Sequence, residues 1–416
     1  MSGAAQNGGF VCAFRGRRDD YQVPLALHEA GLLDRFITDF YTGQDLSAAS
    51  RFLPARLRAP LQMRRKDGLP STRVWQFPAM AVKEALAKSD PARAARIRDA
   101  HDIRLSQAAA QQASRHGANL LLYSAYAADA FEAEYTHRPA KILFQYHPHF
   151  EVERDILAED ARSPMGAAPG CADFENVTRE QRQRSDNAWR LADRIICASS
   201  FTARSLIRAG ASPDRVAIAS YGIAPSDISG GQPAAPLPEA GFRVLFVGSA
   251  IQRKGIHHLL KAWEMADLPT GAQLTVVARS YDRDFFDPAR LPAGCTYHAG
   301  VDRARLAQLY ASSTLFCMPS LIEGFGQVYL EALATGLPVL GTPNTCLPDI
   351  GSEENGVFIS PAGNATALAR KLEELARRLP GDAAIKDRAR LVAGHFGWHD
   401  FRDSIVRVCE AVQSGQ

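Results

Sequence analysis

Two glutamates eight positions apart, Glu323 and Glu331, have the residue type and the setting to bind sugar hydroxyls. An apolar run ends before Glu323, a glycine-bearing loop surrounds it, and a helical pattern carries Glu331 as far as Gly336. This order of strand, loop, helix and stop is typical of a parallel α/β sheet, whose ligands bind at the carboxyl ends of the strands. The pair therefore predicts a sugar-nucleotide site. The alternative is that Glu323 caps the helix and Glu331 is merely solvated.

The turn between the two glutamates predicts a cradle for a phosphate group. Glycines allow backbone N–H groups to approach an anion closely, and the start of a helix favours negative charge. The residues of this turn are Gly324, Phe325, Gly326, Gln327 and Val328. The geometry of a tight turn would require the same glycines, and the two roles are compatible.

Two adjacent cations, Arg253 and Lys254, follow a second apolar run, after Gly248 and Ser249. Their spacing from the glycines fits neither the dinucleotide fingerprint nor a P-loop. Cations at a helix start are unfavourable to the helix dipole by about 0.3–1 kcal/mol, so these two residues do not stabilise the helix. An anionic ligand would reverse that sign, and the segment therefore predicts a phosphate site. The alternative is a pair of solvated charges.

The first half of the chain offers His147 and Gly16 as candidate site residues, each just after an apolar run. Loops at the carboxyl ends of parallel strands face a common crevice, so both are expected near the ligand. His147 and His149 stand two apart, as some metal ligands do, but no third ligand with suitable spacing is evident. Otherwise His147 would be an ordinary surface-loop histidine.

Strand-like and helical segments alternate along the whole chain, which predicts βαβ units and parallel sheets. The chain is too long for one core, because single cores seldom grow beyond about 250–300 residues. A stretch rich in Pro and Gly, residues 223–241, reads as a linker. We therefore expect an N-terminal domain over 1–222 and a C-terminal domain over 242–397. A last helix, about 398–416, is expected to pack back on the first domain.

The segment around Glu323 and Glu331 resembles the retaining glycosyltransferases of family 4, in which a Glu-x7-Glu element binds the donor. That family has the GT-B fold, with two Rossmann-like doubly wound domains facing a central cleft. Residues 193 to about 410 carry the resemblance. An arginine is usual where this chain has Ser249, and Arg253 is expected to supply the missing charge.

The resemblance assigns a role to each candidate residue. Lys254 and Arg253 would neutralise the donor diphosphate, and Glu323 would bind hydroxyls of the donor sugar. Glu331 would bind the ribose, and His147 would donate to a hydroxyl of the donor sugar. Enzymes with this fold are generally metal-independent, so neither a metal nor a cofactor is expected.

The implied function is transfer of a hexose-type sugar from a UDP- or GDP-sugar to a saccharide or lipid-linked glycan, in cell-surface polysaccharide assembly. The first domain would bind the acceptor and the second the nucleotide sugar. Two alternatives share the site. A sugar-nucleotide epimerase with the same fold would isomerise the donor, and a non-catalytic binding protein would hold it without transfer or hydrolysis.

Charge is concentrated in residues 51–104, which hold 13 Lys/Arg against 5 Asp/Glu, whereas the whole chain carries a formal charge of only +3. Apolar side chains are interleaved with these cations, a pattern that suits an anionic membrane surface. A solvated helical face over an ordinary core is an equal alternative. No nucleic-acid motif accompanies the segment, so a nucleic-acid partner is not expected.

Seven scattered cysteines without any Cys-x-x-Cys pair indicate neither a zinc site nor a disulfide framework. Cysteines in apolar runs are typical of a reducing compartment. The start of the chain lacks the pattern of a signal peptide, and no run approaches the ~20 apolar residues of a membrane span. The expected location is the cytoplasm, with peripheral attachment to the inner face of the plasma membrane as a candidate.

Overall fold

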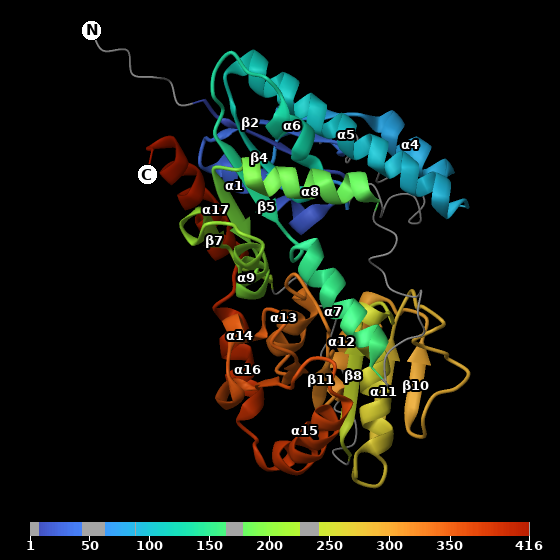
Figure 1. The fold of residues 1–416 in the computed structure, drawn as a ribbon. Coiled ribbons are helices and arrows are strands. Elements are labelled where there is room, and N and C mark those ends of the chain that lie inside the picture. Colours follow the sequence, from blue (N-terminus) through green and yellow to red (C-terminus); the bar gives the residue numbers. More distant parts are fainter. Residues whose placement is uncertain (1–7, 44–62, 88, 164–177, 225–240, 416) are drawn as a thin grey trace, which may run out of the picture.

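The computed structural model describes residues 8–43, 63–87, 89–163, 178–224 and 241–415. Two parallel β-sheets, each surrounded by helices, form two domains that lie one above the other (Figure 1). Every strand pairing in both sheets is parallel. The predicted fold class, with two doubly wound parallel-sheet domains, is confirmed.

The N-terminal sheet has seven strands in the order β3-β2-β1-β4-β5-β6-β7. These strands are β1 (Phe10–Ala13), β2 (Leu33–Thr38), β3 (Val74–Gln76), β4 (Asn119–Tyr123), β5 (Lys141–Gln145), β6 (Arg194–Cys197) and β7 (Val216–Ile218). The helices of this part are α1 (Gln22–Glu29), α4 (Pro78–Leu86), α5 (Pro91–His116), α6 (Ala128–Glu132), α7 (Phe150–Arg162), α8 (Arg179–Leu191) and α9 (Ser200–Arg208). The strand order reverses between β1 and β4, which places a crevice at their carboxyl ends.

The C-terminal sheet has six strands in the order β10-β9-β8-β11-β12-β13. These strands are β8 (Arg243–Val247), β9 (Gln273–Val277), β10 (Cys295–His298), β11 (Leu315–Cys317), β12 (Val339–Gly341) and β13 (Val357–Ile359). The helices are α11 (Ile256–Met265), α12 (Arg303–Ser312), α13 (Gln327–Ala334), α14 (Leu347–Ile350), α15 (Ala365–Arg378), α16 (Ile385–Gly394) and α17 (Trp398–Gln413). Here the order reverses between β8 and β11, the two strands that precede the predicted donor-binding segments.

The central strands form because their sequences are apolar without interruption, as strands covered by helices on both faces must be. Every residue of β1 and of β11 is buried. Helix starts follow ordinary capping chemistry. The Ser199 hydroxyl, for example, accepts a hydrogen bond from the N–H of Thr202 at the start of α9.

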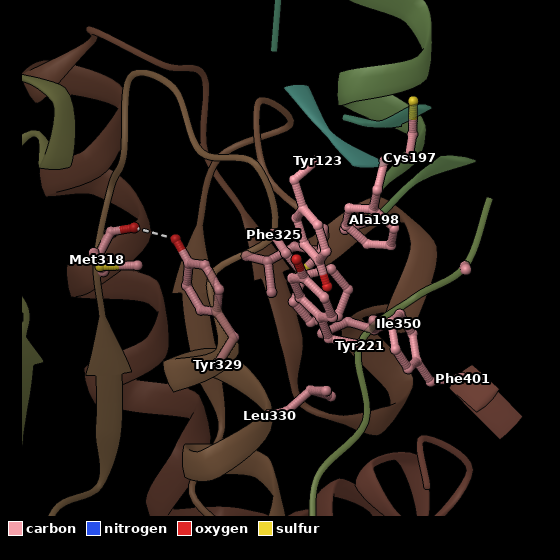
Figure 2. Close-up of a cluster of buried hydrophobic side chains, with 14 of the residues drawn as sticks. Tyr123, Cys197, Ala198, Tyr221, Met318, Phe325, Tyr329, Leu330, Ile350 and Phe401 are labelled. Atoms are coloured by element: carbon pink, nitrogen blue, oxygen red, sulfur yellow. Dashed lines mark hydrogen bonds between the residues drawn. The ribbon is translucent and has the colours of Figure 1, made fainter. Parts of the chain in front are cut away.

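An aromatic cluster joins the two domains beside the crevice. Figure 2 shows Tyr221 next to Phe325 and Phe401, with ring-centroid separations of 5.4 Å for both pairs. Tyr221 follows β7, Phe325 belongs to the glycine turn of the C-terminal domain, and Phe401 lies on α17. The turn that carries Glu323 is therefore anchored in a core shared by both domains.

Two helices connect the domains in opposite directions. The terminal α17 returns to the first domain, where Arg402 Nη1 donates to Gln22 Oε1 at 2.9 Å. In the other direction, α7 reaches down from the first domain to the second (Figure 1). On α7, Val152 and Leu157 pack in one apolar cluster with Leu321 and Ile322.

Several predicted elements need correction. The sequence predicts a helix over 171–191, but α8 begins at Arg179, and residues 171–177 lie outside the described part of the chain. The helix α7 and the short edge strands β3, β10 and β13 were not predicted. Each of these strands has only three or four residues, too few for a hydrophobic period to show.

Two further predictions fall partly on residues that the structure does not describe. The linker 223–241 includes residues 225–240, and the basic segment 51–104 includes residues 51–62. The domain boundaries therefore stay predictions. Within the described remainder of the basic segment, Arg64 pairs with Asp39 at 3.1 Å and Lys66 pairs with Asp20, so these cations are held against the protein itself.

Candidate functional site

A short 3₁₀ turn, Gln252–Lys254, carries the two predicted phosphate-binding cations between β8 and α11. Gly255 follows with φ of 68°, and a Cβ atom there would lie 2.1 Å from the carbonyl oxygen of Pro319. Only glycine fits this position, because it combines positive φ with close backbone contact. The glycine thus presses the turn against the end of β11. Arg253 and Lys254 thus lie directly before the first turn of α11, at the helix N-terminus where the sequence predicted them.

Glu323 forms ion pairs with both cations of this turn. The Lys254 ammonium forms an ion pair with the Glu323 carboxylate, and Arg253 Nη1 lies 3.4 Å from the same oxygen. Glu323 is only 8% exposed. Burial opposes ionisation of this carboxyl, but the charges of Lys254 and Arg253 outweigh it and lower the pKa of Glu323 to about 2. These three predicted residues therefore form one charged cluster rather than solvated surface groups.

His147 is the residue of the N-terminal domain that lies beside this charged cluster. It follows β5 at the carboxyl end of the sheet and lines a cavity together with Arg253. Burial, and then the charge of Arg253, lower the pKa of His147 to about 4. The ring is therefore neutral at pH 7 and has one N–H to donate.

His149 has a structural role. Its Nε2 lies 2.8 Å from Asp186 Oδ1. Its Nδ1 caps α7 by accepting a hydrogen bond from the N–H of Glu151. Because both ring nitrogens are engaged in this way, His149 and His147 do not form a metal-binding pair.

The cavity beside His147 has a volume of about 360 Å³ and lies mainly in the N-terminal domain. Most of its lining residues are polar or charged, and both signs of charge are present. The polar and charged lining residues are Asp99, Asp102, Ser124, Gln145, Tyr146, Glu153, Gln181, Arg182, Arg184 and Ser185, besides His147 and Arg253. Hydroxyl groups both donate and accept hydrogen bonds, so a wall of mixed carboxylate, amide and guanidinium groups suits a polyhydroxylated molecule.

The glycine turn is held between the two domains. The Gly324 carbonyl accepts from Ser199 Oγ at 2.6 Å and from Thr202 Oγ1 at 3.2 Å, both on the N-terminal side. A Cβ atom on Gly324 would lie 2.0 Å from the carbonyl oxygen of Tyr146. Only a glycine allows this approach of two backbones, so its role is domain contact as well as turn geometry.

The rest of the predicted turn divides into packing and exposed residues. The Phe325 side chain is buried against Tyr221, so only its backbone is available to a ligand. Gly326 caps α13 with φ of 90°, Gln327 is exposed, and Val328 is partly buried. One helical turn beyond Gln327, Glu331 accepts from the Tyr310 hydroxyl at 3.0 Å.

Ser249 and Gly16 lie at the ends of β8 and β1, and both make contacts within the protein. The Ser280 hydroxyl donates to Ser249 Oγ at 3.0 Å. The Gly16 N–H donates to Asp39 Oδ1 at 2.9 Å, and it is thereby engaged rather than directed at a ligand.

The loop after β1, which the sequence predicted to face the crevice, has a backbone conformation that the sequence did not indicate. Three consecutive non-glycine residues, Asp19, Asp20 and Tyr21, have left-handed φ angles of 45°, 49° and 59°. Such strain persists only where the surroundings impose it, and it clusters at functional sites. Beside them, the Arg18 guanidinium lies 4.3 Å from the ring centroid of Tyr146, at the edge of the cavity. No local motif marks this loop, because its conformation is fixed by tertiary contacts.

None of the helices formed by the described residues is both long enough and apolar enough to cross a bilayer.

Sequence relatives of this chain are glycosyltransferases. An uncharacterized glycosyltransferase of Methanocaldococcus jannaschii is 31% identical over 123 residues, which cover 28% of this chain and 32% of that protein. The match therefore spans about a third of that relative. The D-inositol 3-phosphate glycosyltransferase of Mycobacteroides abscessus is 26% identical over 309 residues, covering 68% of this chain and 69% of that protein.

Structural comparison extends the likeness to the whole chain. HepE from Anabaena, solved in complex with UDP, aligns with a TM-score of 0.60 at 17% identity, covering 97% of this chain and 100% of that one. At this identity the likeness shows the fold, which is GT-B. Residues 241–378 match the family model for glycosyl transferases group 1. The matched residues are the C-terminal sheet and most of its helices, in a chain with the GT-B fold.

Proposed function

We propose that this protein is a retaining glycosyltransferase of family 4. It moves a hexose-type sugar from a nucleoside diphosphate sugar to a saccharide or lipid-linked acceptor, in the assembly of a cell-surface polysaccharide. One observation carries the proposal. The neutral His147 of one domain lies at a cavity edge with Arg253, which shares with Lys254 the buried carboxylate of Glu323 on the other domain.

The cationic turn is suited to the leaving group of this reaction. When the bond from the anomeric carbon to the diphosphate breaks, negative charge grows on the departing phosphate. Lys254, Arg253 and the N–H groups at the start of α13 would stabilise that charge. A preorganised donor of this kind is typically worth about 2.7–4 kcal/mol in the transition state.

The remaining residues orient the two substrates. The His147 N–H and the Glu323 carboxylate would bind hydroxyls of the donor sugar, and Glu331 would bind the ribose. The acceptor would occupy the polar cavity of the N-terminal domain. A new bond then forms from the acceptor oxygen to the anomeric carbon on the face that the diphosphate leaves, and a phosphate oxygen takes the acceptor's proton. The configuration of the sugar is thereby retained.

The charges of Arg253 and Lys254 replace those that a divalent ion supplies to the diphosphate in other enzymes. We therefore expect transfer to be independent of added Mg²⁺ or Mn²⁺. A chelated enzyme whose turnover rises severalfold on adding either ion would contradict this part of the proposal.

The donor is tested by thermal shift with UDP, GDP, ADP and their sugars. A ligand that binds only the native state raises the melting temperature by mass action, by an amount equivalent to about 2.7 kcal/mol at a hundred times Kd. We expect one uridine or guanosine diphosphate to act, and UDP is the first to test because HepE was solved with it. If no nucleotide shifts the transition at millimolar concentration, the proposed function fails.

The stereochemical outcome is tested with the donor that binds best. Proton NMR of the first product should show the anomeric configuration of the donor. An inverted anomer would contradict retention while leaving the donor site intact. Isomerised nucleotide sugar without transfer would identify an epimerase instead.

We also propose a cytoplasmic location with peripheral attachment to an anionic membrane through residues 51–104. The net basic charge of that segment supports this part of the proposal. Sedimentation with vesicles tests it. The protein should co-sediment with vesicles containing phosphatidylserine in low salt and not with neutral vesicles, and equal behaviour with both would contradict attachment by charge.

A further inference from the structure

Two buried side chains and one partly buried side chain converge where α7 of the first domain meets α11 of the second. Asp160 lies near the end of α7, and His257 and His258 stand side by side in the first turn of α11. His258 Nε2 lies 2.5 Å from Asp160 Oδ1, and His257 Nε2 lies 3.1 Å from Asp160 Oδ2. Both histidines therefore direct the same ring nitrogen at one carboxylate. We call these three residues the α7–α11 cluster.

The carboxylate of the cluster is buried without a permanent cation. Asp160 is 6% exposed and His258 only 1%. Among the described residues, the groups that form ion pairs with Asp160 are these two histidines, and no lysine or arginine does so. An imidazole does not carry the permanent charge of a lysine or arginine side chain. Buried charges in proteins are normally paired or coordinated to a metal, and here hydrogen-bonding groups take the place of a permanent cation.

The donor atoms suit a transition metal. Two imidazole nitrogens and one carboxylate oxygen are a ligand set that Zn²⁺ accepts, with metal–ligand distances of about 2.0–2.2 Å. The three side chains offer one ligand atom each, and these atoms lie within 4.8 Å of one another. Ca²⁺ and Mg²⁺ prefer oxygen ligands and fit the two nitrogens poorly. Three protein ligands leave further positions for water, as zinc sites allow.

We propose that the α7–α11 cluster is a binding site for a divalent transition metal, of which Zn²⁺ is the appropriate probe. The ion would tie the two domains together, because Asp160 comes from the first and the histidines come from the second. Gln252 is part of the same contact, since its Nε2 donates to Asp160 Oδ2 and to the Leu157 carbonyl, both at 2.9 Å. The site is separate from the transfer chemistry and does not depend on the proposed function.

The surroundings of the two histidines also limit the expected affinity for a metal ion. His257 Nδ1 and His258 Nδ1 are buried, and neither has a hydrogen-bond partner among the described residues. Metal-binding histidines usually donate this second nitrogen to an acceptor, and loss of such a partner typically lowers metal affinity 10–100-fold. We therefore expect binding in the micromolar range rather than the nanomolar range of fully supported sites.

The first experiment is a Zn²⁺ titration of the chelator-treated full chain by calorimetry, with the melting temperature as a second readout. We expect one ion per chain and a higher melting temperature. Asp160→Asn and His257→Gln should each weaken binding at least tenfold. The control is His116→Gln, which removes an exposed histidine that lies 3.0 Å from Asp34 in another His–Asp pair and should leave binding unchanged.

Two results would overturn the proposal: no binding at 100 µM Zn²⁺, or unchanged affinity in Asp160→Asn and His257→Gln. Because a variant can fail to fold, an anomalous difference map from Zn²⁺-soaked crystals of the unaltered protein provides an independent test. A peak within bonding distance of Asp160 and both histidines supports the site. Peaks confined to surface histidines refute it.

Discussion

The same three-residue turn, Gln252–Lys254, is flanked by two buried carboxylates that are compensated in different ways. Glu323 on one side meets Lys254 and Arg253, which are permanent cations. Asp160 on the other side meets Gln252 and the two histidines of the α7–α11 cluster. Burial opposes ionisation of Asp160, but hydrogen bonds from His257, His258 and Gln252 lower its pKa below the usual value.

These two ways of compensating a buried carboxylate suit the two sites to different roles. A carboxylate with two full cations is fixed in charge near neutral pH, and the proposed function assigns those cations to the donor diphosphate. A carboxylate held by imidazoles is compensated only by hydrogen bonds, protons or an added cation. One turn thus connects a charged site facing the crevice to a contact between α7 and α11. The following predictions test that division, from the largest expected effect to the smallest.

Removal of the Lys254 ammonium group should have the largest effect, a loss of catalytic rate. We expect Lys254→Ala to lower kcat about 10²–10³-fold, because one stabilising group for the departing diphosphate is lost. Steady-state transfer assays measure this. The matched control is Lys261→Ala, an exposed α11 lysine paired with Glu264, which should change kcat less than twofold. Equal kcat in Lys254→Ala and the unaltered protein would remove Lys254 from the reaction.

The stability contributed by Glu323 should depend on pH. Its folded pKa, about 2, lies below its ordinary value of 4.5. The contribution is therefore complete above about pH 4.5 and is lost as pH falls from there towards 2, on the order of 3 kcal/mol in all. Thermal melts of the unaltered protein should fall in this window, and Glu323→Gln should flatten the dependence. Parallel curves for the two proteins would show that another group dominates.

Loss of the Asp160 carboxylate should weaken the contact between the two domains by a smaller amount. In chelator-treated protein, Asp160→Asn should reduce the free energy of unfolding by about 1–3 kcal/mol, because buried donors on α11 lose their charged acceptor. Denaturant titration measures this. Asp155→Asn changes an exposed carboxylate on the same helix and should have an effect within about 0.5 kcal/mol. If both variants lose the same stability, the contact between α7 and α11 is not what Asp160 supports.

The smallest effect is expected at Glu331, which lies outside both charged clusters. Glu331→Ala should raise the KM for the donor about tenfold, equivalent to about 1.4 kcal/mol, with little change in kcat. Initial-rate kinetics with varied donor separate the two constants. Glu264→Ala, an exposed glutamate on α11, should leave both unchanged. An unchanged KM in Glu331→Ala would remove it from the ribose site.

Much of the fold could be predicted from local patterns. Apolar runs separated by helical lengths predicted two parallel sheets. Short edge strands such as β13 could not be predicted, because three residues carry no period. Helix α7 also escaped prediction, although it spans Phe150–Arg162 and supplies Asp160.

The candidate site was predictable only in part. Glu323, Arg253, Lys254 and His147 were singled out by residue type and by position after an apolar run. Their partners were not, because the ion pair joins Lys254 and Glu323, which are 69 positions apart, and no local pattern links them. Gly324 was expected to serve a phosphate cradle and a tight turn, and its contact with Tyr146 at the domain interface was not foreseen.

By itself, the sequence determined the parallel α/β architecture, the glycine turns and the residues that carry charge at the carboxyl ends of strands. These follow from periodicity and backbone chemistry within a few consecutive residues. Only the tertiary structure decided that Lys254 compensates Glu323, and that Asp160 meets two histidines nearly a hundred positions away. The reason is physical: burial makes the pairing of charges obligatory, and which charges are buried together depends on how the two domains pack.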